Sequence, residues 1–217
     1  MTEKITTSQI IMLPGGFSAG DEPDGSGKFI VAFFRNPRIK DAVTEFLNNR
    51  DGLMLGICNG FQALIKLGLV PYGEIRELDK DSPTLTFNTI GRHISRMAYT
   101  KVNSVNSPWL SNVKVGDVHA VPISHGEGRL VALPQQLDAL FSLGQIATQY
   151  VNCDGNAENG MNGNCNGSFC AIEGILSPDG RVFGKMGHSE RAGKWVARNI
   201  SGNKEQGIFA AGVTYFK

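Results

Sequence analysis

The segment Gly56-Ile57-Cys58-Asn59-Gly60 places a cysteine between two glycines, where the apolar run Leu53–Ile57 meets a helical pattern over Asn59–Leu67. This arrangement is typical of a nucleophile elbow that carries cysteine in the serine position. The turn is so tight that side chains two residues before and after the nucleophile would collide, which explains the glycines. We therefore predict that Cys58 is a nucleophile at a helix N-terminus, where the helix dipole lowers its pKa and the Asn59 N–H can stabilise an oxyanion.

A thiolate nucleophile needs a base, and the base needs a group that orients it. Two of the four histidines stand two residues before an acid, in His125-Gly126-Glu127 and His188-Ser189-Glu190. In extended chain, residues i and i+2 face the same side, so either carboxylate could face its imidazole. The position of His188 after a predicted strand favours the second pair, but spacing alone leaves both open. We expect His93 and His119, which fall within strand patterns, to be ordinary structural or surface residues.

The elements that must hold these residues differ between the two halves of the chain. The first half alternates strands at 9–13 and 53–57 with amphipathic helices that begin at Asn36-Pro37 and at Asn59, which predicts a parallel sheet covered by helices. The second half contains short strands, two of them joined by the turn Ser177-Pro178-Asp179-Gly180, so we expect a mixed, partly antiparallel sheet. These strands are expected at 84–89, 93–102, 118–124, 129–133, 145–151, 172–176 and 182–186. A closing helix is expected at 207–216, and residues 1–217 are expected to form a single domain.

Composition excludes several classes of protein. The 217 residues hold 21 Lys and Arg against 20 Asp and Glu, a net charge of +1, so no nucleic-acid partner is expected. No apolar run is long enough to span a membrane, and no signal peptide opens the chain. The sequence Gly25-Ser26-Gly27-Lys28 lacks the remaining residues of a phosphate-binding loop. Cys153, Cys165 and Cys170 lie in or beside an Asn- and Gly-rich loop at 154–168, and their spacing is not that of a zinc site, so no metal is expected. Without a membrane segment, a signal peptide or a disulfide pattern, the protein is predicted to be cytoplasmic.

Four motifs occur in order along the chain: PGGFS at 14–18, GICNGFQ at 56–62, SHGEGR at 124–129 and GHSER at 187–191. Together they resemble the class I glutamine amidotransferases and, more narrowly, the glutaminase domain of phosphoribosylformylglycinamidine synthase. The resemblance covers nearly the whole chain, and residues 21–26 look like the large single-chain form of that synthase. It implies an α/β, flavodoxin-like three-layer fold with a mixed central sheet.

The resemblance also implies a role for each matching residue. Cys58 matches the nucleophile, His188 the general base and Glu190 the carboxylate that orients the base. The oxyanion-hole donors correspond to Gly16 and Asn59. The residues that match glutamine-binding positions are Gln62, Ser124, His125, Gly126 and Glu127, so the resemblance gives the first histidine pair a binding role.

Two departures from the family pattern affect these expectations. The family usually has Pro-His-Pro-Glu where this chain has Gly187-His188-Ser189-Glu190, so two prolines that would fix the backbone are absent. The chain also opens only about ten residues before the Pro14 motif, so we expect a C-terminal fragment of a longer synthase that lacks its first βα unit. If the missing strand belongs inside the sheet, its two neighbours would have unpaired edges for a partner or a shifted N-terminus to fill.

The implied reaction is hydrolysis of glutamine to glutamate and ammonia, with no cofactor in this chain. The implied partner is the synthase domain of the same parent chain, where ATP and magnesium are expected to convert formylglycinamide ribonucleotide to its amidine. Two alternatives stay open. One is another class I amidotransferase or a cysteine hydrolase, such as a peptidase, and the other is a fragment that folds and docks but is inactive alone.

Overall fold

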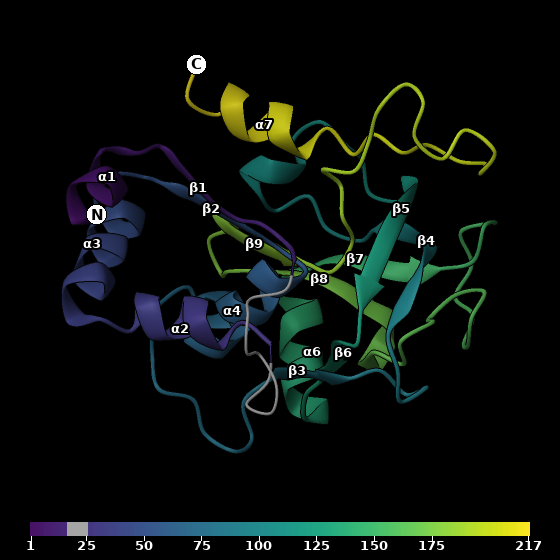
Figure 1. Ribbon diagram of the computed structural model, residues 1–217, viewed down its shortest axis with the longest axis horizontal. Helices are drawn as coiled ribbons and strands as arrows, with labels where there is room; N and C mark the ends of the chain where they lie inside the picture. Colours follow the sequence, from purple (N-terminus) through teal and green to yellow (C-terminus); the bar gives the residue numbers. More distant parts are fainter. Residues whose placement is uncertain (17–25) are drawn as a thin grey trace.

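One seven-stranded sheet runs through the computed structural model, which describes residues 1–16 and 26–217 (Figure 1). The strand order is β1-β2-β9-β8-β7-β4-β5. Strands from both halves of the chain therefore share one sheet, because β9 lies between β2 and β8. The motif residues 17–18 and the segment 21–25 fall outside the described residues.

The parallel part of the sheet consists of β1 (Ile10–Leu13), β2 (Leu53–Ile57) and β9 (Val182–Lys185). Both strands predicted in the first half are confirmed, and every residue of β2 is buried, as expected for a strand covered on both faces. β1 pairs directly with β2, and β2 pairs directly with β9. The described strands therefore leave no vacant place inside the sheet of the kind that would follow if a missing strand belonged there.

The rest of the sheet is antiparallel, which confirms the predicted mixed sheet. Its strands are β8 (Ile172–Leu176), β7 (Ile146–Val151), β4 (Ile94–Val102) and β5 (Val118–His125). The predicted turn at 177–180 joins β8 to β9 as antiparallel neighbours. A separate two-stranded sheet pairs β3 (Thr84–Phe87) with β6 (Glu127–Val131).

Helices lie to both sides of the central strands in Figure 1, with α7 above them and α2, α4 and α6 below. The helices are α1 (Thr2–Thr7), α2 (Lys28–Phe34), α3 (Pro37–Asn48), α4 (Asn59–Leu67), α5 (Leu69–Tyr72), α6 (Pro134–Ser142) and α7 (Ile208–Thr214). Two short 3-10 helices, η1 (Pro108–Leu110) and η2 (Phe169–Ala171), complete the described elements. The helices α3, α4 and α7 are as predicted, with the Asn36 side chain accepting from the Arg38 N–H at the start of α3.

Helices α1, α2, α5 and α6 were not predicted from the sequence. In α2, Phe34 is buried, but Phe29 and Phe33 are exposed. The interpretation of these three phenylalanines as one core face is therefore wrong for two of them, because the helix turns their side chains away from the core.

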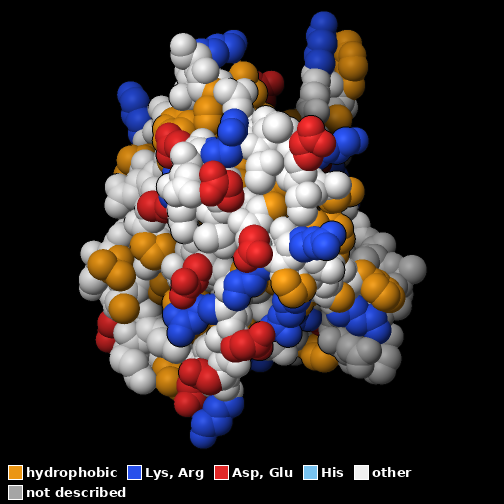
Figure 2. Space-filling view, turned by 90° about the vertical axis from the view of Figure 1, so that its left-hand side faces the viewer, with side chains coloured by type: hydrophobic (Ala, Val, Ile, Leu, Met, Phe, Trp, Pro, Cys, Tyr) orange, Lys and Arg blue, Asp and Glu red, His pale blue; other side chains and the backbone are white. Residues whose placement is uncertain are grey.

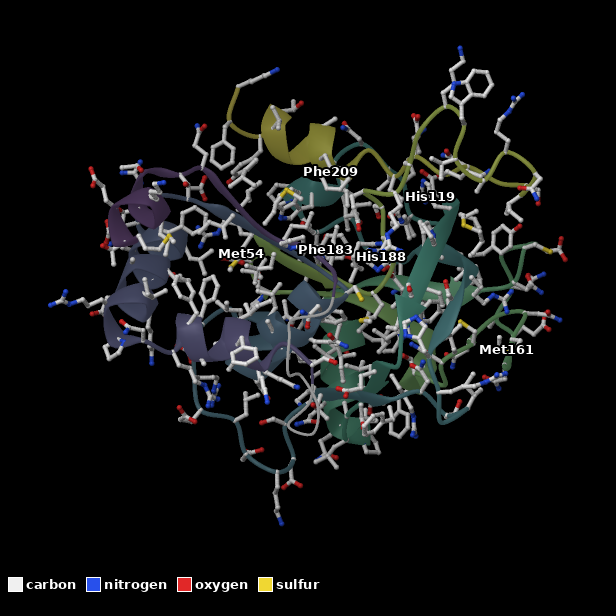
Figure 3. All side chains as sticks on the ribbon, in the orientation of Figure 1. Met54, His119, Met161, Phe183, His188 and Phe209 are labelled. Carbon is white, nitrogen blue, oxygen red and sulfur yellow. The ribbon has the colours of Figure 1, made fainter. Side chains whose placement is uncertain are left out.

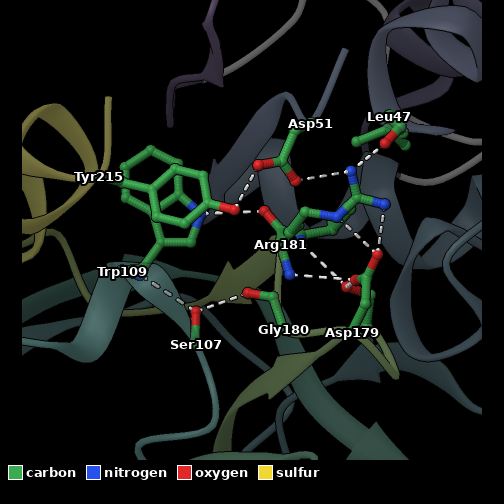
Figure 4. A network of polar contacts seen from close by, with 10 residues as sticks. Leu47, Asp51, Ser107, Trp109, Asp179, Gly180, Arg181 and Tyr215 are labelled. Atoms are coloured by element: carbon green, nitrogen blue, oxygen red, sulfur yellow. Dashed lines mark hydrogen bonds and ion pairs between the residues drawn. The ribbon is translucent and has the colours of Figure 1, made fainter. Parts of the chain in front are cut away.

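The C-terminal helix α7 is tied to the far end of the sheet (Figure 4). Arg181, just before β9, contacts the carboxylates of Asp51 and Asp179, and the Tyr215 hydroxyl donates to Asp51 at 2.6 Å. On the other side, the Trp109 indole donates to the Arg181 carbonyl at 3.1 Å. This network fixes the ends of β2 and β9 opposite to those where Cys58 and His188 follow.

The face that carries α1 and α3 has basic and acidic side chains interspersed over it (Figure 2). This mixed surface agrees with the net charge of +1. Among the helices of residues 1–16 and 26–217, none is both long and apolar enough to cross a bilayer.

Candidate active site

Cys58 lies in a strained turn between β2 and α4. Its backbone angles are φ 51° and ψ −106°, a region that a non-glycine residue seldom occupies. A β-carbon on Gly60 would stand 2.0 Å from the Leu13 carbonyl oxygen, and one on Gly56 would stand 2.8 Å from the Gly60 carbonyl oxygen. The turn therefore has the geometry predicted from the glycine spacing.

His188 follows the end of β9 and lies in the interior of the molecule beside β5 (Figure 3). Its backbone N–H donates to the Pro122 carbonyl at 2.8 Å, and its Nδ1 lies 2.5 Å from Glu190 Oε1. An ionised carboxylate can only accept, so Nδ1 carries a proton, and in the neutral imidazole Nε2 then presents its lone pair. Nε2 is buried and has no hydrogen-bond partner among the described residues, which leaves it available as a base.

Glu190 is the partly exposed end of this pair, with 37% of its side chain accessible. Desolvation raises the pKa of Glu190, but the hydrogen bond from His188 and the nearby charge of Arg191 outweigh it and hold the pKa below its usual value. The carboxylate is therefore ionised near neutral pH, as a group that orients an imidazole must be.

Gly15 brings the thiol and the imidazole together. A β-carbon on Gly15 would stand 3.1 Å from Cys58 Cβ and 2.5 Å from His188 Cε1. Both side chains therefore pack against the side of Gly15 that has no side chain. Both also line one small pocket of about 40 Å³. The described residues around this pocket are Gly16, Ser26, Cys58, Gln62, Ser124, His125, Gly126, His188 and Arg191.

The environment of the Cys58 sulfur contradicts one prediction. Burial raises the pKa of the Cys58 thiol to about 11, although hydrogen bonds from the backbone N–H groups of Asn59 and Gly16 oppose the rise. The N–H groups at the helix N-terminus do lower the pKa as predicted, but the loss of hydration outweighs them, so the predicted net lowering of the Cys58 pKa is wrong. Cys58 is a neutral thiol at pH 7, and its sulfur lies 3.6 Å from the Ser124 carbonyl oxygen, to which it donates.

The residues expected to bind glutamine surround this sulfur from β5, β6 and α4. Ser124, His125 and Gly126 line the pocket directly, as does Gln62. The Gln62 amide donates to the Glu127 carbonyl, which links α4 to β6. Glu127 does not line the pocket itself, and its carboxylate accepts from the Ser26 N–H at 3.3 Å.

His125 is held as a neutral imidazole. Its Nδ1 lies 3.1 Å from the Asn88 side-chain oxygen, and the Asn88 amide donates to the His125 carbonyl at 2.8 Å. Burial, with smaller contributions from His93 and His188, lowers the pKa of His125 to about 3. A histidine that stays neutral and packs beside the pocket suits a binding role better than that of a proton-accepting base.

Two residues of the pocket were missed from the sequence. Arg191 brings a positive charge that favours the Cys58 thiolate, and it was present in the GHSER motif next to Glu190. Ser26 also lines the pocket, although its segment Gly25-Ser26-Gly27-Lys28 matched no complete binding motif in the sequence.

The other cysteines lie away from Cys58. A larger hollow of about 710 Å³ lies between β7 and the Asn- and Gly-rich loop, and Cys165 and Cys170 line it. None of the predicted site residues lines this hollow. The loop contacts β6, because the Asn166 amide donates to the Gly128 carbonyl at 2.8 Å and Ser168 Oγ accepts from the Leu130 N–H at 3.0 Å.

Comparison with known proteins shows to which family this chain belongs. The sequence profile of the CobB/CobQ-like glutamine amidotransferase domain matches residues 1–216. The chain belongs to this glutamine amidotransferase family. It is 37% identical to the phosphoribosylformylglycinamidine synthase subunit PurQ of Treponema denticola, over 95% of this chain and 82% of that protein. It is also 37% identical to the PurQ subunit of Methanococcus maripaludis, over 88% of this chain and 68% of that protein.

Solved structures agree with this membership in the glutamine amidotransferase family. The structure of PurLQS from Thermotoga maritima matches with a TM-score of 0.70 and 29% identity, covering 96% of this chain and 80% of that one. A putative GMP synthase protein from Thermoplasma acidophilum matches with a TM-score of 0.52 at 11% identity, covering 98% of this chain and 75% of that one, which shows a shared fold alone. The predicted class I glutamine amidotransferase fold is confirmed.

Proposed function

We propose that this chain is the glutaminase of a phosphoribosylformylglycinamidine synthase and hydrolyses the side-chain amide of glutamine to glutamate and ammonia. The observation that carries the proposal is the pairing of an elbow cysteine with a carboxylate-held imidazole around one pocket. Its support from known proteins is the membership in a glutamine amidotransferase family and the PurQ names of its relatives.

In the proposed mechanism, glutamine binds with its amide carbon beside the Cys58 sulfur. Because the free thiol is neutral, His188 Nε2 takes its proton as the sulfur attacks, which forms the carbon–sulfur bond. The resulting oxyanion accepts hydrogen bonds from the Gly16 and Asn59 N–H groups, the same two donors that contact the sulfur in the free protein.

The second half of the reaction uses the same imidazole in reverse. Protonated His188 gives its proton to the amide nitrogen, the carbon–nitrogen bond breaks, and ammonia leaves. A water deprotonated by His188 then attacks the thioester carbon and releases glutamate and the thiol. Glu190 keeps the Nδ1–H tautomer and offsets the positive charge of the imidazolium in both halves.

The remaining pocket residues are proposed to hold the substrate. Gln62, Ser124, His125, Gly126 and Glu127 would position glutamine by their amide, carbonyl and imidazole groups. At about 40 Å³ the pocket has room for only a few water molecules, so binding of an amino acid must widen it. Gln62 lines the pocket and donates to the Glu127 carbonyl, so a widening that moves Gln62 would break this bond.

The closed pocket and the neutral thiol favour a second candidate: the chain binds a synthase but hydrolyses glutamine only slowly until that partner opens the site. In either case the ammonia is proposed to pass to the synthase, where ATP and magnesium act, and this chain is proposed to need no cofactor of its own. Its relatives carry the name of a separate subunit, so a synthase domain in the same parent chain stays a prediction. A cytoplasmic location of this chain likewise stays a prediction.

The experiment is release of glutamate from glutamine, measured with and without a PurL-type synthase, ATP, magnesium and formylglycinamide ribonucleotide. We expect hydrolysis that the partner accelerates, that Cys58→Ala abolishes and that Glu190→Gln strongly slows. The matched control is Cys153→Ala, since Cys153 is an exposed thiol outside the pocket. Hydrolysis that survives in Cys58→Ala, or no hydrolysis even with the partner, contradicts the proposal.

A further inference from the structure

A lysine and a glutamate form an ion pair in the centre of the sheet, beneath the segment that carries His188. Lys185 Nζ lies 3.3 Å from Glu173 Oε1, and neither side chain has any exposed surface. The two residues come from the neighbouring antiparallel strands β9 and β8, whose residues are all buried. Because charges lose hydration when they are buried, such a pair does not persist in a core by its attraction alone.

Hydrogen bonds use the remaining capacity of both charged groups. Lys185 Nζ donates to the Gly187 carbonyl at 2.8 Å and to Ser189 Oγ at 3.0 Å, so its three protons have three acceptors with Glu173. Glu173 Oε1 accepts from the Gly187 N–H at 2.5 Å, and Oε2 accepts from the Thr148 hydroxyl at 2.5 Å. Both charged groups therefore have hydrogen-bond partners besides each other, and all of these except Thr148 lie in the segment 187–189.

These bonds hold the residues on both sides of His188. The N–H of Gly187 is bound by Glu173 and its carbonyl by Lys185, so the peptide groups before and after this residue are fixed. Ser189 Oγ is bound by Lys185 and donates in turn to the Gln206 side chain. The imidazole of His188 bonds to Glu190 rather than to the pair, so any effect of the pair on the ring passes through its two neighbours.

The space around Gly187 matches this arrangement. A β-carbon there would stand 2.9 Å from both Glu173 Oε1 and Lys185 Nζ, and 2.7 Å from Val121 Cγ2. A proline at 187 would also lack the N–H that Glu173 binds. This chain has no proline between residues 187 and 190, so the direction of its backbone there depends on hydrogen bonds.

We propose that the buried Lys185–Glu173 pair positions the catalytic imidazole, by holding Gly187 and Ser189 so that His188 keeps its ring between Cys58 and Glu190. Lys185 and Glu173 are positioning residues and do not touch the substrate. The proposal rests on the proposed function for the role of His188, and its structural part, the fixed ring and tautomer of His188, stands on contacts alone.

The test compares Lys185→Met, Glu173→Gln and the double variant Lys185→Met/Glu173→Gln, with Arg35→Met at the exposed Arg35–Glu77 pair as the control. Each single variant leaves one buried charge unpaired and is expected to lower the unfolding temperature, whereas the neutral double variant is expected to regain much of it. The double variant nevertheless lacks the donor to the Gly187 carbonyl and to Ser189. The decisive measurements are therefore made on this folded variant.

Two readouts are taken on the double variant: the side-chain ¹⁵N spectrum of His188, and kcat and KM for glutamine hydrolysis. We expect the His188 spectrum to change from a single Nδ1–H tautomer to a mixture, and kcat to fall by up to about 100-fold while KM changes little. A double variant whose His188 spectrum and kcat both equal those of the wild type overturns the proposal. The proposed function is judged separately on wild-type turnover, because the spectrum reports the position of His188 even in a protein that hydrolyses nothing.

Discussion

The backbone of Gly15 lies against the imidazole of His188, so closely that a β-carbon on Gly15 would stand 2.5 Å from Cε1 of the ring. The same added atom would stand 3.1 Å from Cys58 Cβ. The distance between thiol and base thus depends on the absence of one side chain.

Gly15→Ala is therefore expected to displace His188 from Cys58. We predict a loss of glutamine hydrolysis of about 100-fold, together with a loss of stability of about 1–3 kcal/mol from overpacking. Glutamate release and urea denaturation measure the two effects. The matched control is Gly193→Ala, where the nearest atom would be an ordinary contact at 3.5 Å. Activity within about threefold of wild type in Gly15→Ala would contradict the claim that this contact sets the distance between His188 and Cys58.

The raised pKa of Cys58 gives a prediction for its reactivity in the free protein. With a pKa of about 11, only about one molecule in 10⁴ carries the thiolate at pH 7. We expect the rate of alkylation by iodoacetamide at Cys58 to rise about tenfold per pH unit from pH 7 to 9.5 without a plateau. Peptide mass spectrometry separates this rate from that of the exposed Cys153, which serves as the internal reference. A plateau below pH 8 would mean that the thiol is activated before glutamine binds.

The lowered pKa of His125 predicts a loss of stability in acid. The folded protein resists protonation of this buried imidazole down to about pH 3, whereas an unfolded histidine takes up its proton near pH 6.5. The stability that depends on neutral His125 is therefore fully present above about pH 6.5. As the pH falls from there towards 3, the free energy of unfolding decreases by up to about 1.4 kcal/mol per pH unit.

Chemical denaturation at pH 7, 6 and 5 tests this. We expect His125→Gln to start less stable, because the bond to Asn88 is altered, but to lose stability with a shallower slope than the wild type. His93→Gln removes an exposed histidine and only the smaller His93 contribution to the pKa of His125, so it is expected to keep a slope close to that of the wild type. Parallel slopes for wild type and His125→Gln would contradict the assigned pKa.

Local sequence patterns predicted the sheet better than the helices. Strand alternation and the turn at 177–180 identified the paired strands of the second half, because those signals are local. Helix α6 does have a helix signal in its sequence, a proline at its first position and Leu137, Leu140 and Phe141 at helical spacing. By contrast, α2 is apolar all round and α1 is polar and rich in threonine, so neither shows a period that indicates a helix.

The candidate site shows a similar division. The elbow at Cys58 follows from residues next to one another in sequence, whereas the choice of His188 over His125 needed the resemblance to a family. The pKa of Cys58 was predicted with the wrong sign, because burial by β5 and the segment after β9 is a property of the folded chain. The Lys185–Glu173 pair gave no signal either, since the two residues meet only when β8 and β9 pair.

The central claim is that the Cys58 sulfur attacks a glutamine bound in the pocket beside His188. The most direct measurement is peptide mass spectrometry after treatment with a glutamine analogue that carries an electrophile on its side chain. The account predicts a single adduct on the peptide that contains Cys58, slowed by excess glutamine and absent in Cys58→Ala. Adducts on Cys153, Cys165 or Cys170 with Cys58 unmodified would contradict it.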